Sequence, residues 1–254
     1  MGEGTQPITA CLIIIGNEIL SGRTVDANLP YIAKALGTIG VRLAEVRVVA
    51  DDEVAIVDAV NTCRARHTYV FTTGGIGPTH DDITAACIAK AFGRKFGRHP
   101  EAERLLLAFY PPERVNDARM SMADMPEGAE LVDNPVSVAP GFKLENVYVL
   151  AGVPKIMQAM LDGILPTLKG GAKVLSRSIT VFAPEGDVAT GLGQIQAQHP
   201  ELDIGSYPFF RPTGPGTTVV FRGTEQAEID VAAEALLAMA GELGAKTTEE
   251  PKAT

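Results

Sequence analysis

The sequence predicts an α/β protein with a mostly parallel β-sheet covered by helices on both faces, followed by a small α+β domain. Through the first two-thirds of the chain, short apolar runs rich in β-branched residues alternate with helical patterns. This alternation is typical of a parallel sheet whose strands are buried on both sides. After a Pro/Gly/Lys segment at 166–173 the order becomes strand, helix, two strands, helix. We therefore predict domains over 1–170 and 171–244, and a disordered tail over 245–254.

The first domain contains strands that are each followed by a loop and a helix. Right-handed crossovers bring the loops that follow parallel strands to one edge of the sheet, where ligands bind in such folds. The predicted strands cover residues 8–15, 41–49, 68–73 and 147–151. Helical spacing of apolar residues predicts helices over 29–39, 52–65, 83–92 and the segment after Pro154.

The second domain is predicted to be a βαββα unit. A Gly/Pro-rich segment at 211–216 suits the connection of a hairpin. The strands are expected at 178–183, 203–210 and 217–223, and the helices at 185–198 and 229–243.

Composition excludes several classes of function. The 254 residues carry a net charge of −9, with no Trp and 6% aromatic residues, which argues against a nucleic-acid-binding protein. No apolar run approaches the ~20 residues of a membrane span, and the N-terminus lacks the features of a secretory signal. Cys11, Cys63 and Cys87 lie far apart and match no zinc motif. We therefore expect a cytoplasmic protein without disulfides or structural zinc.

The segment TTGGIGPTHDDIT at 72–84 is the first candidate site, because it joins a predicted strand to a predicted helix. Successive backbone N–H groups and a helix N-terminus form an anion-binding nest, and glycines allow close approach of a ligand. The alternative is a glycine-rich turn in which Asp81 or Asp82 caps the helix. That alternative leaves the glycines and the histidine unexplained. The candidate ligand-binding residues here are Thr73, Gly74, Gly75, Gly77, Thr79 and His80.

Two further loops at the same predicted edge are acidic. The segment 16–28 contains Glu18, Asp26 and Asn28, and residues 51–53 are Asp-Asp-Glu. Asp26 or Asn28 could cap the following helix, whereas Glu18 has no capping task. For residues 51–53, a helix cap with first-turn acids and a functional role are equally open. Carboxylates that face one another favour a bound cation between them.

Taken alone, residues 134–142 (NPVSVAPGF) and 151–154 (AGVP) indicate turns. Together with the preceding motifs they resemble the molybdenum-cofactor biosynthesis (MoaB/Mog) superfamily, and within it the CinA-type branch. The resemblance covers about residues 8–168. The segments that carry it are GNEILSGRTVDAN, VVADDE, TTGGIGPTHDDIT, NPVSVAPGF and AGVP. The segments GIGPTHDD and GSYPFF also resemble the molybdopterin-binding half of eukaryotic FAD synthases.

The resemblance implies a three-layer α/β/α, MoaB/Mog-like domain that is part of a homo-oligomer, a dimer or a trimer. The three glycines of the loop would hold the phosphate of a pterin or nucleotide. Asp82 and Asp52 would be the catalytic acidic residues, with Asn134 and Gly141 at the rim of the ligand site. Mg²⁺ or another divalent cation would be held by the carboxylates of Glu18, Asp26, Asp81 and Asp82. Asn17 stands where many members have Asp, which removes one possible metal ligand.

Three functions are compatible with these residues. The first is a metal-dependent pyrophosphatase acting on an ADP-ribose- or FAD-like dinucleotide, in which the cation neutralises charge on a phosphoryl oxygen. The second is a molybdopterin adenylyltransferase, against which the extra small domain argues. The third is a pterin- or nucleotide-binding module without catalysis, for which ligand affinity would barely depend on Asp82.

Overall fold

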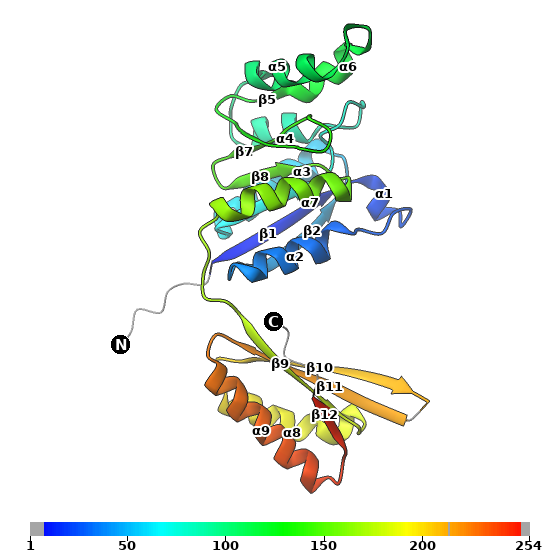
Figure 1. The fold of residues 1–254 in the computed structure, drawn as a ribbon, viewed down its shortest axis with the longest axis vertical. Helices are drawn as coiled ribbons and strands as arrows, with labels where there is room; N and C mark the ends of the chain where they lie inside the picture. Colours follow the sequence, from blue (N-terminus) through cyan, green and yellow to red (C-terminus); the bar gives the residue numbers. More distant parts are fainter. Residues whose placement is uncertain (1–7, 213, 250–254) are drawn as a thin grey trace, which may run out of the picture. The chain divides into compact units, whose positions relative to one another are not determined.

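A computed structural model describes residues 8–212 and 214–249 of the chain. The chain divides into two compact units, Met1–Ala172 and Lys173–Thr254, close to the boundary expected at residue 170. The first unit has two apolar cores and the second unit has one; Figure 1 shows the layers within each unit.

The first unit is built on a six-stranded mixed sheet. Its strand order is β2-β1-β3-β8-β7-β6. The first four of these strands are parallel, and β7 is antiparallel to both of its neighbours, β8 and β6, which confirms the predicted mostly parallel α/β class. The strands are β1 (Thr9–Ile15), β2 (Arg42–Val49), β3 (Tyr69–Thr73), β6 (Glu130–Val132), β7 (Gly141–Leu144) and β8 (Val147–Leu150).

Helices cover both faces of this sheet because its central strands are apolar on both sides (Figure 1). In β1, Cys11, Ile13 and Ile15 belong to one buried core, and Ala10, Leu12 and Ile14 belong to the other. Helices α3 (Glu53–Arg66) and α4 (Thr84–Ala91) pack on the first core. Helices α2 (Asn28–Thr38) and α7 (Pro154–Ile164) pack on the second.

The region between α4 and β7 contains short elements that the sequence patterns did not predict. A two-stranded ribbon pairs β4 (Phe96–Arg98) with β5 (Asp124–Pro126). Helix α5 (Pro100–Phe109) begins where the side chain of His99 accepts a hydrogen bond from the backbone N–H of Ala102. The remaining short helices of the unit are α1 (Asn17–Leu20), α6 (Asp117–Met120), η1 (Pro112–Arg114), η2 (Ser121–Ala123) and η3 (Leu165–Thr167).

The second unit is an antiparallel sheet with two helices on one face (Figure 1). The strand order is β10-β11-β9-β12. The elements are β9 (Leu175–Val181), α8 (Glu185–Gln198), β10 (Asp203–Arg211), β11 (Gly214–Gly223), α9 (Gln226–Glu242) and β12 (Thr247–Glu249). The βαββα order is therefore present, with one strand added.

The added strand β12 corrects the prediction of a disordered tail that starts at residue 245. Thr247–Glu249 pair with β9, and the guanidinium of Arg177 in β9 binds the carboxylate of Glu249 with Nε and Oε1 2.6 Å apart. Backbone pairing together with this ion pair orders a polar segment that has no apolar signature. Residues 250–254 of the predicted tail lie outside the described part of the chain. None of the described helices is long and apolar enough to cross a membrane.

Candidate functional site

The glycine-rich loop begins with a Gly-Gly turn directly after β3. The φ angles of Gly74 and Gly75 are 102° and 67°, in the region that favours glycine. A Cβ atom on Gly74 would lie 2.2 Å from the carbonyl oxygen of Ile15, and one on Gly75 would lie 2.2 Å from Oγ1 of Thr84. The turn therefore fits tightly between the end of β1 and the start of α4.

Backbone contacts join this turn to its neighbours. The buried Thr84 donates from Oγ1 to the carbonyl of Gly74 and from its N–H to the carbonyl of Gly75, both at 3.0 Å. A Cβ on Gly152, in the loop after β8, would lie 3.2 Å from Cα of Gly74. The carboxyl ends of β1, β3 and β8 therefore meet at one edge of the sheet, as the sequence predicted.

Unused backbone donors follow the turn. The N–H groups of Gly75, Ile76 and Gly77 donate no hydrogen bond to any residue that the structure describes. Three consecutive free N–H groups in a glycine-rich turn are the donor set of an anion nest. The loop can therefore bind a phosphate through its backbone.

Buried polar atoms without partners lie at the same edge. Oδ1 of Asn28 and Oγ1 of Thr73 are buried and lack any hydrogen-bond partner within the described residues. Nδ2 of Asn28 donates to the carbonyl of Gly152 at 2.8 Å. Thr73 pairs with Ile14 and Leu150, and both of these residues belong to the core on which α2 packs. Because α2 begins at Asn28, Thr73 and Asn28 are on the same side of the sheet. A buried polar atom left unpaired costs about 1–3 kcal/mol, so both oxygens fit a role in holding a polar ligand.

Asp81 and Asp82 converge on one hydroxyl. Oγ1 of Thr79 lies 2.6 Å from Oδ1 of Asp81 and 2.5 Å from Oδ2 of Asp82. The N–H of Thr79 also donates to Oδ2 of Asp82, at 2.8 Å. The hydrogen bond from Thr79 lowers the pKa of Asp81 below its usual value. Neither carboxylate caps α4, whose N-cap residue is Ile83, so the capping interpretation of these residues is wrong.

The acidic residues of the two other loops have local tasks. Asp52 is the N-cap of α3, and its Oδ1 accepts a hydrogen bond from the N–H of Ala55 at 2.9 Å. Oδ1 of Asp26 accepts from the N–H of Leu29 at 2.7 Å, in the first turn of α2. Capping therefore accounts for Asp52, whereas Asp26 precedes Ala27, the N-cap of α2, and uses one carboxylate oxygen to bind the backbone of Leu29.

The four expected metal ligands are not gathered into one cage. Within residues 8–212 and 214–249, two groups of three possible ligands have their ligand atoms within 4.8 Å of one another. Neither group contains Glu18, Asp26, Asp81 or Asp82. Glu18 instead folds its carboxylate over Gly16, where an added Cβ would lie 2.6 Å from its oxygens. Asp81 and Asp82 remain together as the acidic pair of the site.

Three other predicted ligand-binding residues have different surroundings from those expected. Asn134 is buried, and its amide is used within its own loop: Nδ2 donates to Ser137 and Ala139, and Oδ1 accepts from two backbone N–H groups. A Cβ on Gly141 would lie 2.3 Å from the carbonyl oxygen of Val149, so this glycine permits close packing of β7 on β8. The side chain of His80 is 99% exposed.

A cavity lies beside the loop. A space of about 30 Å³, room for one water, is lined by residues that include Ile76, Gly77, Asp124 and Phe142. Phe96 borders both this space and a shallow cavity of about 330 Å³ along the β4–β5 ribbon. Lys95, Arg98 and Glu127 are among the residues that line the larger cavity. This cavity was not predictable from the sequence, because the ribbon has no recognisable strand pattern.

Comparison with known proteins agrees with the fold. Residues 11–170 match the family model described as "Probable molybdopterin binding domain", and residues 173–248 match the middle domain of FAD synthase. A protein of Archaeoglobus fulgidus is 34% identical over 219 residues, which cover 86% of this chain and 92% of that protein.

A CinA-like protein of Desulfosudis oleivorans is 35% identical over 209 residues, which cover 76% of this chain and 50% of that protein. The chain therefore spans about half the length of this relative. The crystal structure of a CinA protein of unknown function from Thermoplasma acidophilum matches with a TM-score of 0.61 and 32% identity, covering 64% of this chain and 99% of that one. The chain belongs to the family of the molybdopterin-binding domain, in its CinA-type branch.

Proposed function

We propose that this protein is a divalent-metal-dependent pyrophosphatase that splits an ADP-ribose- or FAD-like dinucleotide. The observation that carries the proposal is the set of unused polar groups around the Gly-Gly turn. Free N–H groups of the turn and the unpaired oxygens of Thr73 and Asn28 lie at the sheet edge, in the same loop system as Asp81 and Asp82. Membership of a molybdopterin-binding family supports a ligand that joins a heterocycle to a phosphate.

Each part of the site has a task in this reaction. The N–H groups of Gly75 and Gly77 would bind the phosphate, because backbone donors fixed in place need no reorganisation when charge develops on it. Asn28 and Thr73 would bind a polar edge of the same ligand. Asp81 and Asp82 would hold a cation such as Mg²⁺, whose ligands are oxygens and water. The cation would supply charge neutralisation and an activated water.

Turnover of a nucleotide panel tests the proposal. We expect the full chain to release AMP from ADP-ribose or FAD when Mg²⁺, Mn²⁺ or Co²⁺ is present, and not after chelation. Asp82→Ala should lower kcat/KM at least ~10²-fold, as loss of a group that stabilises transition-state charge does. Asp58→Ala, which removes an exposed carboxylate on α3, serves as the matched control. Absence of AMP with all three metals would refute the pyrophosphatase.

A binding module without turnover is the second candidate. It is favoured by two observations: Asp26 and Asp52 each accept a hydrogen bond from the backbone at the start of a helix, and the four expected metal-binding carboxylates are not gathered into one group of the described residues. Calorimetry with the same nucleotides distinguishes the two functions. Tight binding that Asp82→Ala leaves unchanged, without product, would support the module, whereas ATP-dependent adenylylation of molybdopterin would support the transferase instead.

A further inference from the structure

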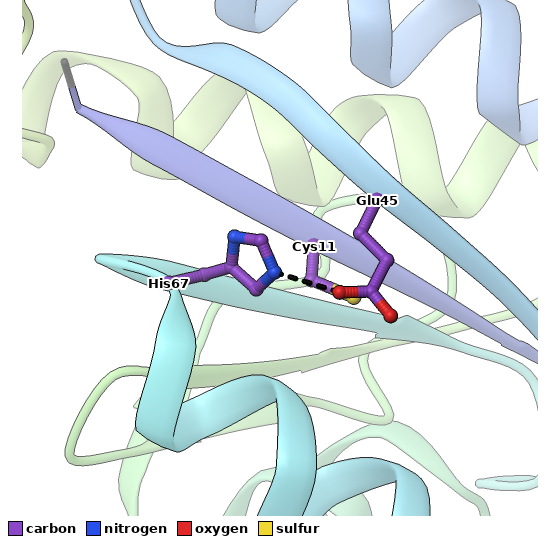
Figure 2. Close-up of side chains that lie close together, drawn as sticks. All are labelled: Cys11, Glu45 and His67. Carbon is purple, nitrogen blue, oxygen red and sulfur yellow. Dashed lines mark hydrogen bonds and ion pairs between the residues drawn. The ribbon is translucent and has the colours of Figure 1, made fainter.

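A second cluster of metal-binding side chains lies in the first unit, in neither loop of the proposed active site. Cys11 lies in β1, Glu45 is its register partner in β2, and His67 ends α3. One ligand atom of each lies within 4.8 Å of those of the other two. Figure 2 shows the three side chains pointing toward one another. Cys11 is fully buried, and the side chain of His67 is 9% exposed.

The thiol of Cys63 lies next to Cys11 but is not one of the three grouped ligands. Its Sγ lies 2.9 Å from Sγ of Cys11, and it is fully buried. Cys63 and His67 are four residues apart at the end of α3, so both belong to the same side of the helix. The thiol of Cys11, the imidazole of His67 and the carboxylate of Glu45 form a set of sulfur, nitrogen and oxygen donors that suits Zn²⁺ and does not suit Mg²⁺.

Outer contacts orient two of these donors. Nδ1 of His67 lies 3.3 Å from Oγ1 of Thr9, and its Nε2 lies 2.9 Å from Oε2 of Glu45. The other carboxylate oxygen, Oε1, accepts a hydrogen bond from Nε of Arg47 at 2.7 Å. The atoms that face the cluster are thus Nε2 and Oε2, while the outward atoms are held by neighbours. Metal-ligating histidines and carboxylates are supported in this way.

The surrounding charge also fits a bound cation. One thiolate, from Cys11, and one carboxylate, from Glu45, would together neutralise a divalent cation. The Glu45 side chain is 23% exposed, which provides a path from solvent.

We propose that Cys11, Glu45 and His67 are three protein ligands of a zinc-class divalent cation. Bonds of about 2.0–2.3 Å place tetrahedral ligand atoms ~3–4 Å apart, and the three ligand atoms already lie within 4.8 Å of one another, so they need to close by about 1–2 Å at most. The cation ties β1 and β2 to the end of α3. This site is independent of the proposed pyrophosphatase, since its ligands are different residues.

Cobalt spectroscopy of the purified full chain tests the site. After chelation, Co²⁺ alone should bind in a ratio of one per chain and give a thiolate-to-cobalt charge-transfer band with the visible bands of tetrahedral Co²⁺. Zn²⁺ should displace it and raise the Tm of the protein. Glu45→Gln and His67→Gln, at partly exposed positions, should weaken Zn²⁺ binding at least ~10-fold, and Thr9→Val should weaken it ~10-fold through His67.

Cys87→Ser is the matched control, because Cys87 is a buried thiol that belongs to neither metal-ligand group of the described chain. It should keep the cobalt spectrum, whereas Cys11→Ser should lose the charge-transfer band. The proposal is wrong if the folded wild-type protein shows no thiolate–cobalt band, or if the band and the Zn²⁺ affinity survive in His67→Gln and Glu45→Gln. Both readouts are independent of nucleotide turnover.

Discussion

Gly75 and Gly93 have similar backbone angles but different surroundings. Their φ angles are 67° and 60°. A Cβ on Gly75 would lie 2.2 Å from Oγ1 of the buried Thr84, whereas a Cβ on Gly93 would meet nothing within 4 Å. Gly93→Ala should therefore cost only the ~1–2 kcal/mol of a left-handed alanine. Gly75→Ala should cost more, because Thr84 must also move and lose its hydrogen bond to Gly74.

Urea unfolding of the two alanine variants measures this difference. The nucleotide or pterin affinity of Gly75→Ala should fall as well, because the displaced turn carries the free N–H groups. Equal free energies of unfolding for the two variants would show that the contact with Thr84 is not important.

Residues of the candidate site were predictable where their chemistry is local. The Gly-Gly turn and the pair Asp81–Asp82 could be found because glycines and acids are adjacent in the sequence. Asp26 and Asn134 are also in conspicuous motifs, yet hydrogen bonds within their own loops use them. A motif does not reveal whether a polar atom is already paired, and pairing depends on loop conformation.

At the scale of elements, Arg177 shows how one side chain holds an otherwise weak strand. Its guanidinium, 10% exposed, binds Asp230 and Glu234 of α9 and Glu249 of β12. Arg177→Gln should destabilise the second unit by about 1.5–3 kcal/mol, the usual value of charged hydrogen bonds at a sheltered site. It should also increase amide hydrogen exchange in β12.

Arg222→Gln provides the control within the same sheet. Arg222 is 35% exposed and its guanidinium lies 3.8 Å from the carboxylate of Asp203, so its ion pair should contribute less than ~1 kcal/mol. Denaturant unfolding and hydrogen exchange measure both effects. If β12 exchanges equally fast in the two variants, Arg177 does not anchor the strand.

The elements that could be predicted from the sequence are those whose apolar composition indicates that they are buried. The run at 8–15 is mostly apolar because β1 lies between two cores. The run at 68–73 contains β3, which lies between the same two cores. Strand β12 and the β4–β5 ribbon are short and polar or interrupted by Pro and Gly, so backbone pairing and distant side chains decide them. The cluster of Cys11, Glu45 and His67 was hidden for the same reason, since its donors come from three separate elements.

At the scale of the whole molecule, the two units have separate cores, so each should fold when expressed alone. Residues 1–172 contain both cores of the mixed sheet, the Gly-Gly turn and the Cys11–Glu45–His67 cluster. This fragment should unfold cooperatively and keep the nucleotide and Co²⁺ affinities of the full chain within about 2–3-fold. Residues 173–254 hold a single small core and should be the less stable fragment, because short domains bury a smaller share of their surface.

Circular dichroism melting and cobalt titration of both fragments test this division. The control is the fragment 173–254, which lacks the cluster and should give no thiolate–cobalt band. If residues 1–172 bind Co²⁺ as the full chain does but no longer bind the nucleotide, the second unit takes part in ligand binding. If residues 1–172 fail to fold although the full chain does, the independence of the two cores is refuted, because the larger core would then need the smaller unit for its stability.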